Sequence, residues 1–136
     1  MKPIIYFDNS ATTRPYNEVI EKMNYISLND YGNASSLHSM GITAQKHLND
    51  SRLKIANALN VDKSEIYFTS GGTESNNLAV LGCLKANKKA KKHVIASKVE
   101  HPSILEILKQ LEIEGYIADY INVDENGEIL LNELES

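Results

Sequence analysis

Apolar residues follow two alternating patterns along the chain, a spacing of three or four residues and short continuous runs. The first pattern predicts helices starting near residue 17 and spanning residues 41–59, and a further helix after the glycines at 71 and 72. Runs rich in β-branched and aromatic residues predict strands at residues 65–69, 93–97 and 116–123. Pro102 is expected to open a helix that Gly115 ends, and another helix is expected to begin at Leu131 and to be cut off.

Strands that alternate with helices predict the fold class. Each connection is long enough for a right-handed crossover, which favours an α/β fold with a mostly parallel sheet and flanking helices. No repeat or Pro/Gly/Ser-rich linker interrupts the sequence, so we expect residues 1–136 to form a single, incomplete domain. Ligands of such sheets bind at the carboxyl ends of the strands, and the loops there are the first place to look for chemistry.

Composition narrows the function classes. A net charge of −4 disfavours a nucleic-acid surface, and the lysines between residues 85 and 92 are expected to be a solvated helix end. No apolar stretch reaches the roughly 20 residues of a membrane-spanning helix, so we expect a cytoplasmic protein with no membrane partner. The lone Cys83 excludes an internal disulfide framework and a thiolate zinc cage, and we expect it to be a small buried apolar residue. No metal site is predicted.

The turn after the residue 65–69 segment carries the most chemical information. Gly71 and Gly72 lead directly into a helix with Thr73 and Ser75 in its first turn, which places free N–H groups and the positive end of the helix dipole together. This arrangement favours a single phosphate, although an ordinary capped glycine turn explains the same residues equally well. His101 follows the next strand at the same sheet edge, where an imidazole can stack on a flat ring or move protons.

Four motifs in order resemble one enzyme family. They are YFDNSATT at residues 6–13, GNASSLH at 32–38, TSGGTESNN at 69–77 and EHPS at 100–103. Together they resemble the N-terminal portion of the cysteine desulfurases, the NifS/IscS-like group of class V aminotransferases, which are fold-type I enzymes dependent on pyridoxal 5'-phosphate. Ala34 stands where this group usually has proline. The resemblance implies an N-terminal segment of about residues 1–30 followed by part of the large cofactor-binding domain.

The resemblance also implies roles for individual residues. Gly72 and Thr73 would hold the phosphate of pyridoxal 5'-phosphate, and His101 would be the catalytic residue that stacks on the pyridine ring and assists proton transfer. Residues implied to lie near the substrate are Asn9, Ala11 and Thr12 of the first motif and, in a loop directed toward the partner of a homodimer, Ser36 and His38. For the loop residues, hydrogen bonding within the loop is an equally good explanation.

The implied reaction converts L-cysteine to L-alanine and an enzyme persulfide for iron–sulfur cluster or thio-cofactor assembly, with a sulfur-acceptor or scaffold protein as a partner. Within these 136 residues no lysine has the Ser-x-His-Lys context of the family's cofactor-binding lysine. The two arginines, Arg14 and Arg52, are expected to be solvent-exposed, and Cys83 lies in the wrong place to be the catalytic cysteine. We therefore expect this chain alone to be inactive. The alternatives are part of a selenocysteine lyase or class V aminotransferase, or a truncated interaction module without catalysis.

Overall fold

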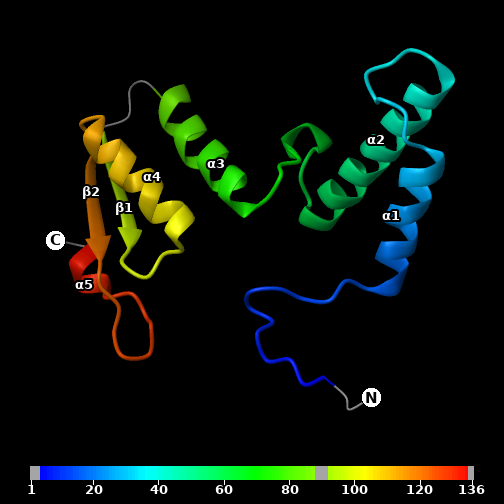
Figure 1. Cartoon of the computed structure of the whole chain (residues 1–136). Coiled ribbons are helices and arrows are strands. Elements are labelled where there is room, and N and C mark those ends of the chain that lie inside the picture. Colours follow the sequence, from blue (N-terminus) through cyan, green and yellow to red (C-terminus); the bar gives the residue numbers. More distant parts are fainter. Residues whose placement is uncertain (1–3, 88–91, 135–136) are drawn as a thin grey trace. The chain divides into compact units, whose positions relative to one another are not determined.

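The computed structural model describes residues 4–87 and 92–134. The chain divides between Tyr67 and Phe68 into two compact units, Met1–Tyr67 (unit 1) and Phe68–Ser136 (unit 2). Unit 1 contains the helices α1 (Asn17–Asn29) and α2 (Ser39–Leu59) and a short 3-10 turn, η1 (Lys63–Glu65). Unit 2 contains α3 (Gly72–Ala86), β1 (His93–Ser97), α4 (Pro102–Ile113), β2 (Ile117–Ile121) and α5 (Leu131–Leu134) (Figure 1). Each unit is described separately below.

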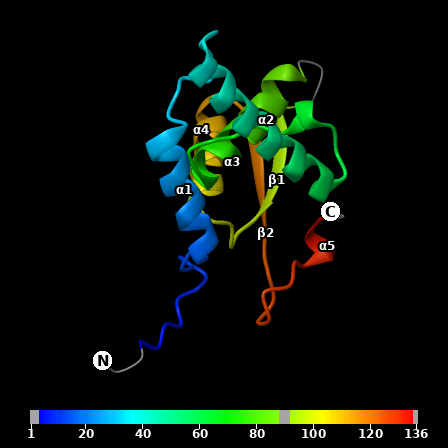
Figure 2. The same ribbon diagram turned by 90° about the vertical axis from the view of Figure 1, so that its right-hand side faces the viewer.

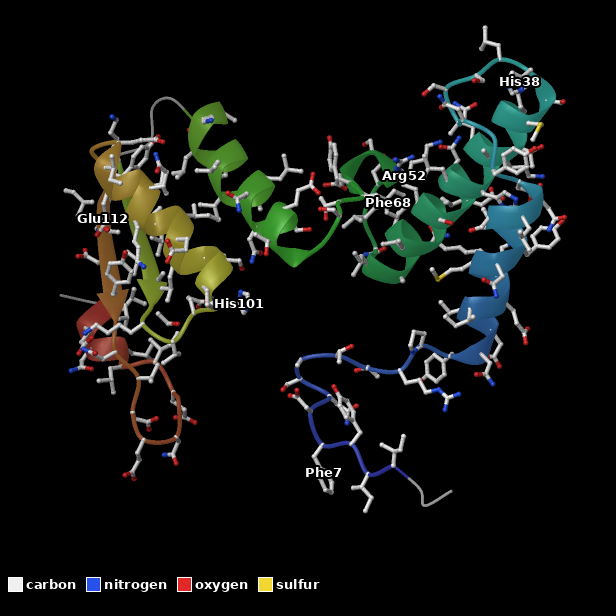
Figure 3. The ribbon with its side chains drawn as sticks, viewed as in Figure 1. Phe7, His38, Arg52, Phe68, His101 and Glu112 are labelled. Carbon is white, nitrogen blue, oxygen red and sulfur yellow. The ribbon has the colours of Figure 1, made fainter. Side chains whose placement is uncertain are left out.

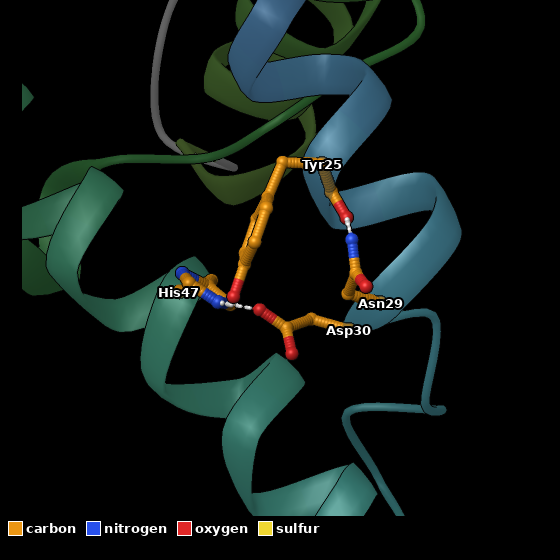
Figure 4. Close-up of polar contacts among 4 residues, drawn as sticks. All are labelled: Tyr25, Asn29, Asp30 and His47. Atoms are coloured by element: carbon orange, nitrogen blue, oxygen red, sulfur yellow. Dashed lines mark hydrogen bonds and ion pairs between the residues drawn. The ribbon is translucent and has the colours of Figure 1, made fainter.

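A polar contact links the end of the first long helix of unit 1 to the second. His47 on α2 lies with its Nε2 atom 2.7 Å from a carboxylate oxygen of Asp30, the residue that follows α1 (Figure 4). The side chain of Asn29 donates to the carbonyl of Tyr25 at 2.9 Å and so completes the last turn of α1. The sequence-based prediction of two helices in this region is confirmed.

The predicted strand at residues 65–69 is wrong. Glu65 instead ends η1, where a reciprocal cap forms: the Ser64 N–H donates to Asp62, and the Asp62 N–H donates to Glu65, each at 2.8 Å. The next residue, Ile66, has extended backbone angles, but its carbonyl accepts a hydrogen bond from Arg52 Nε at 3.2 Å. No described strand lies beside this segment, so it lacks the neighbour that a strand requires. The same contact leaves Arg52 half-buried, which corrects the expectation of full exposure.

The sheet of unit 2 is parallel, as predicted, and consists of two described strands. β1 and β2 run side by side in register from His93 opposite Ile117 to Ser97 opposite Ile121 (Figure 2). β2 is shorter than the predicted residues 116–123. At its start the N–H of Tyr116 still donates to the carbonyl of Leu111 and closes α4. Beyond its end, Val123 forms an isolated antiparallel bridge instead of continuing the parallel pairing.

The core of unit 2 lies between α4 and one face of the sheet. Ile107, Leu108 and Leu111 of α4 are buried, and half-buried apolar residues from α3 and both strands pack against them, among them Val80, Leu81, Leu84, Val94, Ala96, Ala118 and Tyr120. Side chains of the intervening strand positions, such as Ile95 and Ile117, are exposed. Cys83 is exposed as well, which corrects the prediction of a buried thiol. The reason is that α3 packs against the core through Val80, Leu81 and Leu84, and Cys83 is not among the residues that contact it.

Candidate functional site

The glycine turn before α3 is closed by side-chain hydrogen bonds on its outer side. The Ser70 N–H and hydroxyl both donate to one carboxylate oxygen of Glu74 at 2.6 Å, and the hydroxyls of Thr69 and Ser75 lie 2.6 Å apart. The Ser70 hydroxyl, followed by its backbone N–H, lowers the pKa of Glu74, so this carboxylate is ionised at neutral pH. Within the described residues, neither carboxylate oxygen of Glu74 accepts a hydrogen bond from Gly72 or Thr73.

The donors of Gly72 and Thr73 are available to a ligand. Within the described residues no hydrogen bond uses the backbone N–H of Gly72 or Thr73, and the Thr73 hydroxyl also has no partner there. The first N–H groups of a helix have no partner within the helix, and they point toward any anion placed at its N-terminus. A Cβ atom built at Gly71 or Gly72 would meet no atom within 4 Å. The turn therefore offers both donors and space for a phosphate group.

His101 stands immediately before α4 and caps it. Its backbone is extended, and its Nδ1 atom accepts the N–H of Ser103 at 3.1 Å. Pro102 occupies the first helical position, where its missing N–H leaves no bond unmade. The side chain is exposed at the end of α4 that is nearer to the start of α3 (Figure 3).

One groove in unit 2 joins the two motifs. It has a volume of about 390 Å³, and both Thr73 and His101 line it. Its remaining lining residues come from α3 and α4 and are Asn77, Leu81, Pro102, Ser103, Glu106, Ile107 and Gln110. The structure thus brings together two predicted site residues that are 28 positions apart in the sequence. Gly72 directly precedes Thr73, at the first residue of α3.

The other predicted residues belong to unit 1. Asn9, Ala11 and Thr12 lie in an exposed turn, in which the N–H groups of Ala11 and Thr12 donate to the carbonyl of Asp8 at 3.2 and 3.3 Å. Ser36 is half-buried, and its N–H donates to the carbonyl of Asn33 at 2.9 Å.

His38 caps α2, where its Nδ1 accepts the Gly41 N–H at 3.4 Å. This is the loop hydrogen bonding that the sequence left open beside a substrate role. A side chain on Gly41 would also clash with the loop, because its Cβ would lie 2.2 Å from the Ser36 carbonyl oxygen.

Sequence reasoning missed the polar residues that complete the groove. Asn77 lies four positions after Thr73 on α3, and Gln110 lies four positions after Glu106 on α4. Residues four apart share one helix face, so polar pairs at this spacing were the available signal. The described ranges contain no cluster of three or more potential metal ligands, and no helix within them is long and apolar enough to cross a membrane.

Comparisons with known proteins give one consistent result. The model of the family described as aminotransferase class-V matches residues 5–136. A cysteine desulfurase of Trichormus azollae is 42% identical over 98% of this chain, and the cysteine desulfurase IscS of Clostridium botulinum is 40% identical over all of it. A solved NifS-like protein superimposes with a TM-score of 0.90 at 41% identity, covering 96% of this chain and 36% of that one. A structure of SspA in complex with cysteine has a TM-score of 0.78 at 35% identity, covering 85% of this chain and 33% of that one.

The chain spans about a third of the length of these relatives, 33% of the Trichormus protein and 34% of the Clostridium protein. The family match nonetheless extends from residue 5 to residue 136, a range that includes the glycine turn and His101. The chain belongs to the aminotransferase class-V family.

Proposed function

We propose that this chain provides the phosphate site and the ring-facing histidine of a pyridoxal-phosphate-dependent cysteine desulfurase. The observation that carries the proposal is the groove that Thr73 and His101 share. Relatives named cysteine desulfurase, which match the chain over nearly its whole length, support the choice of reaction within the family.

The residues present fit the phosphate end of the cofactor. The open N–H groups of Gly72 and Thr73 and the Thr73 hydroxyl are donors of the kind that hold a phosphate at a helix N-terminus. An ionised Glu74 in the same turn opposes an anion, and the two Ser70 donors at its Oε2 atom offset part of that charge. The groove volume of about 390 Å³ lies within the range of small-molecule sites.

Each residue then has a defined task. Gly72 and Thr73 bind the phosphate and so fix the position of the ring, while His101 covers the ring and holds or releases a proton at its imidazole. When bound, pyridoxal 5'-phosphate supplies an electron sink for the carbon next to the amino group. Asn9, Ala11, Thr12, Ser36 and His38 are proposed to border the substrate.

In a complete cysteine desulfurase the proposed net reaction transfers one sulfur atom. L-Cysteine and an enzyme thiol give L-alanine and an enzyme persulfide: the C–S bond of cysteine and the S–H bond of the thiol are broken, and an S–S bond and the C–H bond of alanine are formed, so no external oxidant is needed. We further propose a cytoplasmic homodimer that passes sulfur to an acceptor or scaffold protein for iron–sulfur or thio-cofactor assembly. The 136-residue chain lacks the Ser-x-His-Lys context, and we expect it to release no alanine or sulfide from cysteine.

Binding of pyridoxine 5'-phosphate to the 136-residue chain tests the phosphate site. This ligand lacks the aldehyde of pyridoxal 5'-phosphate, so it cannot react with surface lysines. Titration calorimetry should show weak binding that pyridoxine, the same ring without phosphate, does not reproduce. Thr73→Val keeps the shape and removes the hydroxyl, and it should weaken binding about twofold to tenfold, the effect of one ordinary hydrogen bond.

Ser75→Ala is the matched control, because it removes a hydroxyl from the same helix turn that is already bonded to Thr69. It should leave the affinity close to that of the wild type. Equal affinity for the two ligands, or an unchanged affinity for Thr73→Val, contradicts the proposed phosphate site. A borohydride-reducible adduct of pyridoxal 5'-phosphate at one specific lysine, with alanine and sulfide formed from cysteine, contradicts the expected inactivity.

A further inference from the structure

A chain of hydrogen bonds connects α3 to the imidazole of His101. Asn76 Nδ2 donates to the Ser103 hydroxyl oxygen at 2.8 Å, and this contact is partly buried. The same hydroxyl oxygen lies 2.9 Å from His101 Nδ1, and the Ser103 N–H donates to Nδ1 at 3.1 Å. Asn76 and Ser103 are 27 positions apart in the sequence, so the contact depends on how α3 and α4 pack.

The donors and acceptors fix the direction of each hydrogen bond in this series. A backbone N–H can only donate, so Nδ1 of His101 presents a lone pair to it and carries no proton. The amide nitrogen of Asn76 also only donates, so it occupies a lone pair of the Ser103 oxygen and leaves the hydroxyl proton free to turn toward Nδ1, where it shares the single lone pair with the Ser103 N–H. In the neutral imidazole the proton must then be on Nε2.

We propose that Asn76 and Ser103 are positioning residues that hold His101 in the Nε2-protonated form. Nε2 is then the nitrogen that exchanges a proton with a group bound in the groove. The choice of tautomer is independent of the proposed function, and only its use in catalysis rests on the proposed role of His101.

Helix capping alone does not explain the arrangement. The cap of α4 requires the Ser103 N–H and the His101 ring, and both would be present without Asn76. Asn76 adds a donor from a different helix, and among the described residues its side chain bonds to the hydroxyl that lies beside Nδ1. A purely structural cap therefore predicts no effect of Asn76 on the tautomer, whereas positioning predicts one.

Long-range proton–nitrogen correlation spectra of the 136-residue chain read the tautomer directly, at about pH 9, where an ordinary imidazole is neutral. In the wild type, Nε2 should be the protonated nitrogen of His101. Asn76→Asp replaces a donor with an acceptor of nearly the same shape, which draws the Ser103 hydroxyl proton away from Nδ1. The ratio of the Nε2-protonated to the Nδ1-protonated form should then fall about twofold to tenfold, as expected for the loss of one hydrogen bond.

Asn77→Asp is the charge-matched control. It places the same carboxylate one residue further along α3, on a side chain that bonds to the Thr73 carbonyl and lines the same groove. It should leave the tautomer ratio unchanged. An equal effect of both variants, or a wild-type ring protonated on Nδ1, overturns the proposal.

A second pair of variants decides the question if Asn76→Asp perturbs the fold. Ser103→Ala removes the hydroxyl and should lower the same ratio, and Ser103→Thr restores a hydroxyl and should recover it. No change with Ser103→Ala contradicts the proposal. Because these spectra need no bound ligand, they remain readable even if pyridoxine 5'-phosphate fails to bind, so the two proposals can fail separately.

Discussion

Substitution by alanine should have opposite effects on the stability of unit 2 at two of its glycines, Gly82 and Gly115. A Cβ atom at Gly82, inside α3, or at Gly115, after α4, would meet no atom within 4 Å, so alanine adds no clash at either position. The backbone differs, because Gly115 has a φ of +83° in the left-handed region. Its N–H donates to the carbonyl of Glu112 at 3.0 Å and closes the last turn of α4.

The magnitudes follow from the two backbone conformations. A left-handed residue with a Cβ atom costs about 1–2 kcal/mol, so Gly115→Ala should lower the free energy of unfolding of unit 2 by that amount. Alanine inside a helix is more stable than glycine by about 0.5–1 kcal/mol, so Gly82→Ala should raise it. The two variants should therefore differ by about 1.5–3 kcal/mol.

Native-state hydrogen exchange measures this difference within unit 2. The amides of Leu111 and Ile121 are suitable probes, because both residues are buried and both belong to elements of this unit. Gly115→Ala should speed their exchange, and Gly82→Ala should slow it. A change in the same direction for both variants would refute the assignment of strain to the φ angle of Gly115.

Three further predictions concern single contacts. Hydrogen bonds from the Asn122 N–H and side-chain amide lower the pKa of Glu133, so their stabilisation is present above the ordinary glutamate pKa and is lost as the pH falls through the lowered value. Protection of the Asn122 amide from hydrogen exchange should therefore fall as the pH drops below the ordinary glutamate pKa, and constant protection there would contradict this. Asp30→Asn weakens the half-buried contact with His47 and should lower the free energy of unfolding of unit 1 by about 1 kcal/mol, measured by urea titration, whereas an unchanged midpoint would show that the contact adds nothing. Cys83 should react with a thiol reagent in the native chain about as fast as in denaturant, and strong protection would contradict its exposure.

Features that depend on neighbouring residues in the sequence were predictable. Pro102 begins α4, and Gly115 follows its end, because a missing N–H and a positive φ are local requirements. The predicted strand at residues 65–69 failed because a strand depends on a partner elsewhere in the chain. The carbonyl of Ile66 bonds to Arg52 instead.

The candidate site was predictable to a similar degree. Thr73 and His101 each follow from a local motif, and the structure places both on one groove. The carboxyl-edge rule of parallel sheets applies to His101, which follows β1, but for Thr73 it depended on the strand predicted at residues 65–69, which does not form. The contact between Asn76 and Ser103 was not predictable, because it depends on the side-chain packing of two helices. The burial of Cys83 was predicted wrongly for a related reason, since helix periodicity does not reveal which apolar positions another element covers.

The central claim is that a phosphate binds at the start of α3 beside His101. Backbone amide spectra of the 136-residue chain, recorded during titration with pyridoxine 5'-phosphate, test this claim most directly. The account predicts that the largest shifts fall on the amides of Gly72 and Thr73, with a smaller shift at His101, and that pyridoxine does not shift Gly72 or Thr73. Shifts confined to the lysines, or spread evenly over both units, would contradict it.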